Sequence, residues 1–441
     1  MNIQANIKRI TPTTIIVGID VAKENHYAQI TDCHGLALVK PVKVHNSING
    51  FENLLSKTKE LAERHGCDQV MIGMEPSGHY WRALGWYLML HESKPVVLGV
   101  NPYHTKQAKE LDDNSQTKSD PKDALIIAHL IRNGNFYDTY LPEGEYAELR
   151  QLNTERQRIM KQIVRTRNIL IALIDEFFPE YATVWESVTC QASLEFLKTY
   201  AFPSDIMSVS KSKLLEDIGE ITKGRKNDEL LGKIIQAASR SIGVKEGQNA
   251  VRMRISNLID DLLHFDRQKD AIEVEQETVM EALQLGKLLQ GMRGVGPVIA
   301  AGFIGEIGDV SRFANWKQVR SLAGLNLVEN SSGKHKGNTK ISKRGRPYLR
   351  YVLYMAGEQG CKWNPEMHDY YRCLTERKSN PLKRGQALVA VGLKVMRILF
   401  HMAKTGEAYD PSKALGAVRA QQASSLGIAA NLPANDGNMV A

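Results

Sequence analysis

Two short apolar segments of this 441-residue chain each end in an acid, and this pattern constrains the fold more than any other feature. The segment Thr13–Ile19 is rich in β-branched residues and precedes Asp20, and the segment Gln69–Met74 precedes Glu75. Such segments are typical of buried strands. A buried carboxylate without a partner is costly, whereas ligand sites gather at the carboxyl ends of strands in α/β sheets. If the two strands are adjacent and parallel, Asp20 and Glu75 meet at one edge of a sheet.

The segments around these two strands predict a mixed α/β domain. Two further strands are expected at residues 26–31 and 36–44, because the turn signal Asp32-Cys33-His34-Gly35 separates them. Together with the first strand they form an antiparallel meander. Apolar positions at helical spacing predict a helix over 48–64, and another helix and strand follow at about 80–91 and 95–100. The predicted order is βββ-α-β-α-β-α.

A second pair of acids, Asp120 and Asp123, lies where a polar loop at 111–119 gives way to an apolar helical pattern. Pro121 suits the first turn of a helix, and residues three apart share a helix face. One interpretation makes these acids an N-cap and a first-turn residue that the helix dipole favours. The other groups all four acids in one cup, which needs cations to remain ionised. Oxygen ligands select Mg²⁺ or Mn²⁺, and two such ions roughly 3.5–4 Å apart promote displacement at phosphorus.

Composition favours a folded, intracellular protein of two or three domains with a polyanionic partner. The chain is too long for one ordinary core, and its net charge is +8 with a pI near 9.0. The five cysteines are scattered without a C-x-x-C pair, so neither a disulfide framework nor a zinc site is indicated and a cytoplasmic location is expected. No segment resembles a signal peptide or approaches the roughly twenty apolar residues of a membrane span, which argues against a membrane role.

The middle of the chain contains two long apolar seams with heptad-like spacing, at residues 149–177 and 251–283. They predict two long helices that pair either with each other or with another subunit. The first helix carries a basic face that is either merely solvated or follows a phosphate backbone: Arg150, Arg156, Arg158, Lys161, Arg165 and Arg167. The segment between the helices, about 181–250, is less periodic, and no function follows from it.

Two features of the carboxyl-terminal part favour contact with nucleic acid. Arg293, Gly294 and Gly296 form a Gly-x-Gly turn before a helical pattern, which is either a helix-hairpin-helix contact to a phosphate backbone or a simple turn between packed helices. The stretch 331–350 has seven Lys or Arg residues and no acid, and its first half is a polar loop. Its candidate nucleic-acid-binding residues are Lys334, Lys336, Lys340, Lys343, Arg344 and Arg346.

Several amino-terminal motifs resemble the RuvC-like Asp-Glu-Asp-Asp domain of the insertion-sequence transposases of the IS110 family, which is related to the Piv-type DNA invertases. These motifs are Gly18–Glu24, Met74–Tyr80, Val100–Pro102 and Lys118–Ala124. The resemblance implies an RNase H-like fold in which the four acids, Asp20, Glu75, Asp120 and Asp123, bind the divalent metals.

The carboxyl-terminal motifs are similar to the second domain of the same family. They are Ala323–Leu325, Ser332-Gly333, Ile341–Gly345 and Leu349–Met355. In that domain a serine before a glycine attacks the DNA and forms a phosphoserine link, a role that the spacing assigns to Ser332, with Ser331 as the fallback. The family also implies a bridge RNA that pairs with donor and target DNA.

We therefore expect an α/β RNase H-like domain at 1–140, a helical coiled-coil region at 141–287, a mostly helical transposase domain at 288–415 and a disordered tail at 416–441. The expected function is metal-dependent DNA strand exchange through a serine nucleophile, in a homo-oligomer. One alternative is a RuvC-like nuclease or site-specific invertase that uses metal-activated water. Another is a nucleic-acid-binding protein without catalysis.

Overall fold

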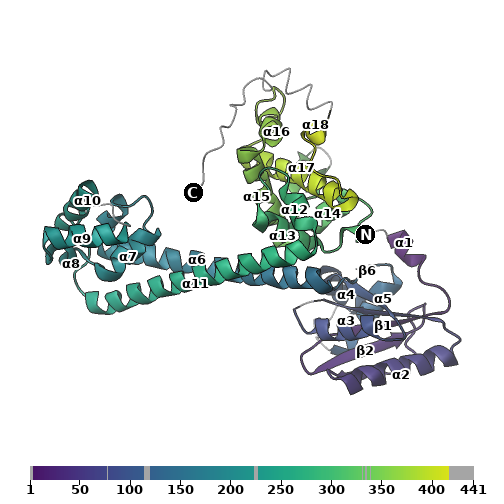
Figure 1. Cartoon of the computed structure of the whole chain (residues 1–441). Coiled ribbons are helices and arrows are strands. Elements are labelled where there is room, and N and C mark those ends of the chain that lie inside the picture. The colour runs from purple at the N-terminus through teal and green to yellow at the C-terminus, as the bar shows by residue number, and fades with distance from the viewer. Residues whose placement is uncertain are drawn as a thin grey trace. The chain divides into compact units, whose positions relative to one another are not determined.

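The computed structural model describes residues 3–76, 78–113, 120–222, 227–329, 331–332, 335–337 and 339–416, and their side chains except those of 110–113, 120, 331–332 and 335–336. The chain divides into two compact units, residues 1–141 and 142–441 (Figure 1).

The first unit is built on a six-stranded mixed sheet of order β3-β2-β1-β4-β5-β6. The central strand β1 pairs antiparallel with β2, as the sequence predicted, and parallel with β4, which meets the condition for bringing Asp20 and Glu75 together. Strand β4 in turn pairs parallel with β5. Because helices cover both faces, the strand is buried on both, and Ile15, Ile16, Val17 and Ile19 are inaccessible to solvent. The strands are β1 (Thr14–Asp20), β2 (Asn25–Thr31), β3 (Val42–His45), β4 (Gln69–Met74), β5 (Val96–Val100) and β6 (Phe136–Asp138).

The helices of this unit divide between the two sheet faces. Strand alternation sends Ile15, Val17 and Ile19 into a cluster with α2 and α3, whereas Ile16 packs with α5. A short helix, α1, is tied to the edge of the sheet because the Asn6 side chain donates to two backbone carbonyls of the 134–136 segment. The helices are α1 (Ile3–Ile7), α2 (Ile48–Arg64), α3 (Trp81–Leu90), α4 (Pro102–Asp113) and α5 (Asp120–Arg132).

Three sequence expectations differ from the observed elements here. The third strand is only β3, at 42–45, and residues 36–41 contribute a single bridge, between Ala37 and Thr31. The expected loop at 111–119 does not include 111–113, because α4 continues to Asp113, and 114–119 lie outside the described residues. The edge strand β6 was not predicted, since three residues are too few for a periodic signal.

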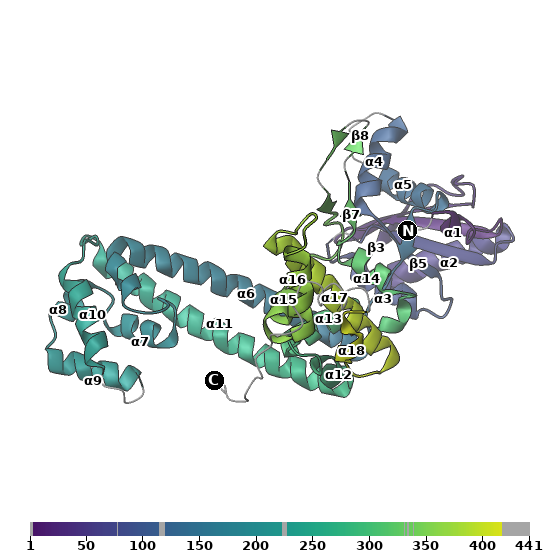
Figure 2. The same ribbon diagram turned by 90° about the horizontal axis from the view of Figure 1, so that it is seen from above.

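In the second unit, α6 (Gly144–Phe177) and α11 (Gln248–Ala282) lie side by side along much of their length in both views (Figures 1 and 2). The long helices therefore pair within the chain. Their interface is not purely apolar. The amide of Asn153 is inaccessible, accepts a hydrogen bond from Gln276 at 2.8 Å and donates one to a carbonyl of α13 at 2.9 Å.

The seam predicted for α6 did not include this buried amide, and Arg156 was assigned to the basic face of that helix. Arg156 instead pairs with Glu273 of α11, with 2.8 Å between Nε and the carboxylate. Arg158, another member of the basic face, pairs with Glu155 on its own helix. Two residues of the basic face are therefore occupied by carboxylates of the helix pair. This favours a structural role for them over contact with a phosphate backbone.

Short helices cap the end of the helix pair where α6 stops and α11 begins (Figure 1). Their core is aromatic, with Phe178, Tyr181, Phe196 and Phe202 almost completely buried. Burial raises the pKa of the Tyr181 hydroxyl, which donates to the carbonyl of Ser193. These elements are a 3-10 helix η1 (Pro179–Thr183), α7 (Gln191–Thr199), α8 (Pro203–Met207), α9 (Lys211–Ile221) and α10 (Asp228–Ser239).

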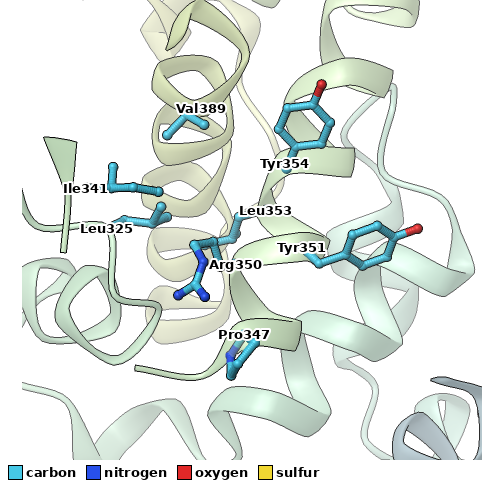
Figure 3. Close-up of a pocket in the computed structure, with 8 residues that line it drawn as sticks. All are labelled: Leu325, Ile341, Pro347, Arg350, Tyr351, Leu353, Tyr354 and Val389. Carbon is cyan, nitrogen blue, oxygen red and sulfur yellow. The ribbon is translucent and has the colours of Figure 1, made fainter. Parts of the chain in front are cut away.

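A helical bundle forms at the opposite end of the α6–α11 pair. Its helices α15 and α17 approach closely because Gly357 and Gly392 face the partner backbone, where an added Cβ would lie 2.3 and 2.1 Å from carbonyl oxygens. A pocket of about 280 Å³ opens beside this contact (Figure 3). The bundle contains α12 (Leu285–Gln290), α13 (Pro297–Ile307), η2 (Val310–Arg312), α14 (Trp316–Leu322), α15 (Pro347–Trp363), α16 (Pro365–Thr375), α17 (Arg384–Thr405) and α18 (Pro411–Ala414).

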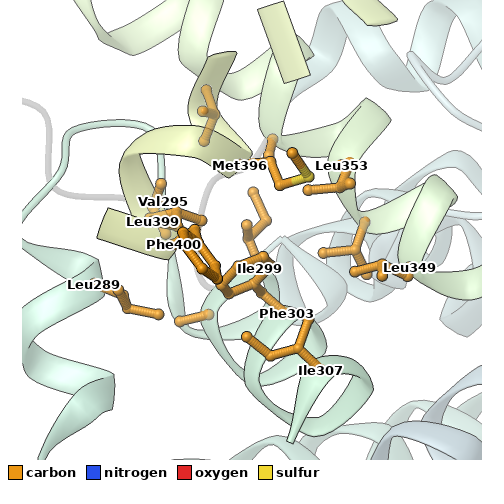
Figure 4. Packing of buried hydrophobic residues seen from close by; sticks show 14 of the residues in the cluster. Leu289, Val295, Ile299, Phe303, Ile307, Leu349, Leu353, Met396, Leu399 and Phe400 are labelled. Carbon is orange, nitrogen blue, oxygen red and sulfur yellow. The ribbon is translucent and has the colours of Figure 1, made fainter. Parts of the chain in front are cut away.

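The core of the bundle surrounds α13, whose residues from Ile299 to Ile307 are all buried (Figure 4). Phe303 of α13 and Leu399 of α17 belong to this cluster. Among the described helices, α17 alone is long and apolar enough to cross a membrane by length and composition, in contrast to the expectation that no segment approaches a membrane span. Half of its most apolar window is buried, the pattern of a core helix.

Candidate active site and nucleic-acid interface

The register of the sheet places Asp20 and Glu75 beside each other. Asp20 ends β1, Glu75 directly follows β4, and the preceding residues Ile19 and Met74 are partners in the parallel pairing. Neighbouring strands lie about 4.8 Å apart. Alternation puts both acids on the face opposite Ile19, which is the face that α5 covers.

Helix α5 packs directly on this face because glycines replace side chains beneath it. A Cβ on Gly18 would lie 2.2 Å from the carbonyl oxygen of Ala124, and one on Gly73 would lie 2.3 Å from the side chain of Ile131. Gly18 and Gly73 lie two residues before Asp20 and Glu75, so they share the same faces of their strands.

The direction of α5 brings its first turn to the edge where β1 ends. The last turn contacts the 32–35 turn near the start of β1: His129 Nε2 lies 3.2 Å from the Gly35 carbonyl, and Arg132 donates to that of His34 at 2.8 Å. The first turn therefore lies toward Asp20. Asp120 begins this helix and Asp123 follows one turn later, although the Asp120 side chain lies outside the described residues.

Asp123 is buried and already has a cationic partner. The residue is 4% exposed, and its Oδ2 accepts a hydrogen bond from Nζ of Lys109, on α4, at 2.5 Å. A buried carboxylate requires such compensation. Sequence reasoning missed Lys109, because a lysine fourteen residues earlier gives no periodic signal for this pairing.

Three separate backbone segments bring carboxylates toward this edge, and carboxylate oxygens are the ligands that a hard divalent cation prefers. Asp20, Glu75 and Asp123 are the described members. Within the described part of the chain, no group of three or more His, Cys, Asp or Glu residues has metal-binding geometry. That set does not include the side chain of Asp120.

The described residues of the serine stretch include two short antiparallel strand pairs between α14 and α15, rather than only an irregular loop. At its root β7 pairs antiparallel with β10, and further out β8 pairs antiparallel with β9. Ser331 is aligned with Lys336 and Ser332 with His335. These strands are β7 (Leu327–Val328), β8 (Ser331–Ser332), β9 (His335–Lys336) and β10 (Lys340–Ile341), and we call residues 327–341 the serine hairpin.

The basic residues around the serine hairpin fall into two groups. Lys340, Lys343 and Arg344 are exposed, whereas Arg346 is half-buried and donates to the carbonyl oxygen of Glu306. Its guanidinium also lies 3.7 Å from the carboxylate of Glu306, whose pKa is raised by burial against the opposing effect of Arg346. These contacts favour a structural role for Arg346. Lys334 and the side chain of Lys336 lie outside the described residues.

Lys343 has an unusual backbone conformation, with a φ of 55° in the left-handed region. L-residues with a side chain rarely adopt it. The conformation is held because the Lys343 amide donates to the Gly324 carbonyl at 2.9 Å, and the Ser342 hydroxyl donates to the same oxygen at 3.1 Å. The turn that follows the serine hairpin is therefore fixed while the Lys343 side chain remains exposed.

The Gly-x-Gly turn packs against a neighbouring helix, as the interpretation of a simple turn between packed helices predicts. Gly294 has a φ of 88°, and an added Cβ would lie 2.8 Å from the carbonyl oxygen of Gln359. This close approach is to α15 of the same chain. Gly296 and Arg293 are exposed beside the first turn of α13, where nothing lies within 4 Å of a Cβ added to Gly296.

Comparison with known proteins agrees with both halves of this arrangement. Residues 17–179 match the transposase domain described as the DEDD domain of IS110 elements, and residues 286–372 match the transposase family IS116/IS110/IS902. The 44.8 kDa protein of insertion element IS116 from Streptomyces clavuligerus is 25% identical over 399 residues, covering 90% of this chain and 96% of that protein.

Two other relatives have similar sequence identity, one over most of this chain and the other over about two thirds of it. The 42 kDa protein of IS900 from Mycobacterium paratuberculosis is 23% identical and covers 90% of this chain and 97% of its own length. The 43.6 kDa protein of IS110 from Streptomyces coelicolor is 24% identical, over 67% of this chain and 73% of its own length. Because the two domain matches follow each other in one chain and together span more than half of it, this protein belongs to the IS110/IS116 family of insertion-sequence DNA transposases.

Proposed function

We propose that this transposase cuts and rejoins DNA with two cooperating centres, the acids at the sheet edge and a nucleophilic serine, Ser332. The observation that carries this proposal is the register of β1 and β4, which aligns Asp20 with Glu75 at the edge toward which the acid-bearing turn of α5 points. The strand order β3-β2-β1-β4-β5, with β1 antiparallel to β2 and parallel to β4, supports an RNase H-like fold for 1–140.

In this proposal four acids hold two divalent ions, either Mg²⁺ or Mn²⁺. The four acids are Asp20, Glu75, Asp120 and Asp123. The bound cations would polarise the scissile phosphate and lower the pKa of a nearby hydroxyl. The ammonium of Lys109 occupies Oδ2 of Asp123. This oxygen can therefore bind a metal only if the ammonium withdraws. Its exposure of about a third leaves it a route into solvent.

Ser332 would act as the nucleophile at the tip of the serine hairpin. Its Oγ forms a bond to phosphorus as the bond between phosphorus and a deoxyribose oxygen breaks, and the leaving oxygen takes up a proton. The phosphoserine preserves the phosphodiester energy. A hydroxyl of the exchanged strand then attacks that phosphorus and releases the serine, which completes rejoining.

The exposed cations of the carboxyl-terminal unit would hold the strands during this exchange. Lys340, Lys343 and Arg344 follow the serine, and Lys334 and Lys336 belong to the same proposal by sequence. Arg293, Gly294 and Gly296 would add a backbone contact at the start of α13. Each cation neutralises a phosphate and makes binding salt-dependent.

The family resemblance motivates two more parts of the proposal. One is a bridge RNA that pairs with donor and target DNA, and sequencing the RNA that copurifies with the protein tests it. The other is a homo-oligomer, which the long helices α6 and α11 also motivate, with the domains 1–140, the α6–α11 coiled coil at 141–287 and 288–415. A monomeric mass by light scattering, measured with both nucleic acids bound, would contradict the oligomer.

Covalent trapping tests the serine mechanism. Protein made from its native gene with flanking DNA is incubated with Mg²⁺, and protein–DNA adducts are resolved on a denaturing gel. We expect an adduct that Ser332→Ala and Asp20→Asn abolish and that the neighbouring control Ser331→Ala retains. Cleavage without an adduct would point to a nuclease or invertase that uses activated water. Full recombination by an Asp120→Asn, Asp123→Asn double variant would refute the metal centre.

A further inference from the structure

The pocket beside the serine hairpin has walls that suit a planar ring. It lies between β10, α15 and α17, and its volume of about 280 Å³ is near the lower limit of small-molecule sites. Ile341 and Val389 line one side, and Tyr351 and Tyr354 line the other with their hydroxyls directed away (Figure 3). The interior is apolar, so the pocket offers contact area rather than hydrogen bonds.

The polar side chains of this pocket are held in place before any ligand binds. Tyr351 is 54% exposed, and its ring stacks against that of buried Tyr348, with 6.1 Å between ring centroids and 22° between planes. The guanidinium of Arg350 donates to the carbonyl oxygen of Ala323 at 2.9 Å. It also donates to the carbonyl oxygen of Lys343 at 3.4 Å. A fixed aromatic ring and a fixed guanidinium plane are surfaces on which bases stack.

The charge around the pocket points to a polyanion. Lys340 precedes Ile341 of the pocket wall, Lys343 follows it by two residues, and both are exposed. The nearest acid on α15 beyond Tyr354 is Glu358, which pairs with Arg384 at 3.6 Å. A nucleic-acid strand whose phosphates contact Lys340 and Lys343 would present a base to the apolar pocket that Ile341 lines.

We propose that this pocket receives one unpaired nucleobase of the strand that lies along the serine hairpin. The proposal rests on the proposed function and adds to it a contact that holds an unstacked nucleotide at the root of the serine hairpin. Because the pocket recognises a π face, it accepts any base, and it excludes paired bases since these keep their stacking partners.

The test compares binding of the full-length protein to oligothymidylate and to an abasic oligodeoxyribose phosphate of equal length, by fluorescence anisotropy. Single-stranded RNA of the same length forms a second arm. The variants are Tyr351→Leu, Tyr351→Phe and the control Trp363→Leu, which removes an equally exposed aromatic ring, also 54%, from the same helix. Thermal unfolding checks that each variant is folded.

We expect the parent to prefer the base-bearing strand, and Tyr351→Leu to reduce that preference by roughly fivefold or more, as the loss of one stacking contact implies. Tyr351→Phe and Trp363→Leu should keep it. An unchanged preference in folded Tyr351→Leu would overturn the pocket proposal and leave the proposed function intact. Self-association lost in Tyr351→Leu with unchanged affinity for both strands would instead assign the pocket to a protein partner. A parent that binds neither strand would count against the proposed function itself.

Discussion

Replacing Lys343 with glycine should weaken nucleic-acid binding without destabilising the protein. At a φ of 55° a lysine pays roughly 1–2 kcal/mol of conformational strain, which glycine does not. Glycine also increases the entropy of the unfolded chain, which costs about 0.4–1 kcal/mol. The difference predicts a variant that is equally stable or about 1 kcal/mol more stable.

The expected binding effect follows from the loss of one exposed charge. If Lys343 neutralises one phosphate, the slope of log K against log salt should fall by about 0.9 for duplex DNA or 0.7 for single strands. When the salt concentration rises from 50 to 200 mM, the parent protein should therefore lose about threefold more affinity than the Lys343→Gly variant. Anisotropy titrations at four salt concentrations measure the slope, and thermal unfolding measures stability.

The matched control is Lys94→Gly in the first unit, because Lys94 is another exposed lysine in the left-handed region, with a φ of 41°. Its loss changes net charge and strain in the same way. A salt slope that falls equally in both variants would assign the effect to net charge alone. An unchanged slope in Lys343→Gly, or a melting temperature several degrees lower, would refute the reasoning.

Three further perturbations test the site and its support. Lys109→Met should destabilise the metal-free protein by about 1–3 kcal/mol, because it leaves Asp123 buried without its cation, and Mg²⁺ should restore part of the loss in thermal unfolding; no loss would show that this pair is not formed. Glu306→Gln should stabilise the protein at neutral pH, since a pKa raised by burial means that the folded state disfavours the charged form. That gain should shrink as pH falls through the raised pKa and vanish below the usual Glu value of about 4.3, whereas a gain independent of pH would contradict it. Gly18→Ala should lower both stability and strand transfer, because its Cβ would lie 2.2 Å from a carbonyl oxygen of α5. The control is Gly232→Ala, because an added Cβ there has nothing within 4 Å. Equal behaviour of the two variants would exclude the packing of α5 on Gly18.

The sequence by itself determined the elements that repeat over short distances. The acid-terminated strands β1 and β4, helix α2 and the long helices α6 and α11 are visible because alternation and helical spacing depend only on residues two to four apart. It also determined that Asp20 and Glu75 would meet if those strands were parallel neighbours, and the family resemblance was correct. The role of each acid and of Ser332 remains a prediction.

Only the tertiary structure decided which distant groups compensate one another. Asp123 has Lys109 as its partner, Arg346 is occupied by Glu306, and Gly294 is required by the backbone of α15. None of these pairings has a local signal, because burial creates the need for a partner and the fold chooses which residue lies within reach. The sequence therefore named the acids at the sheet edge, whereas the packing of α4 and α5 determined the charge that surrounds them.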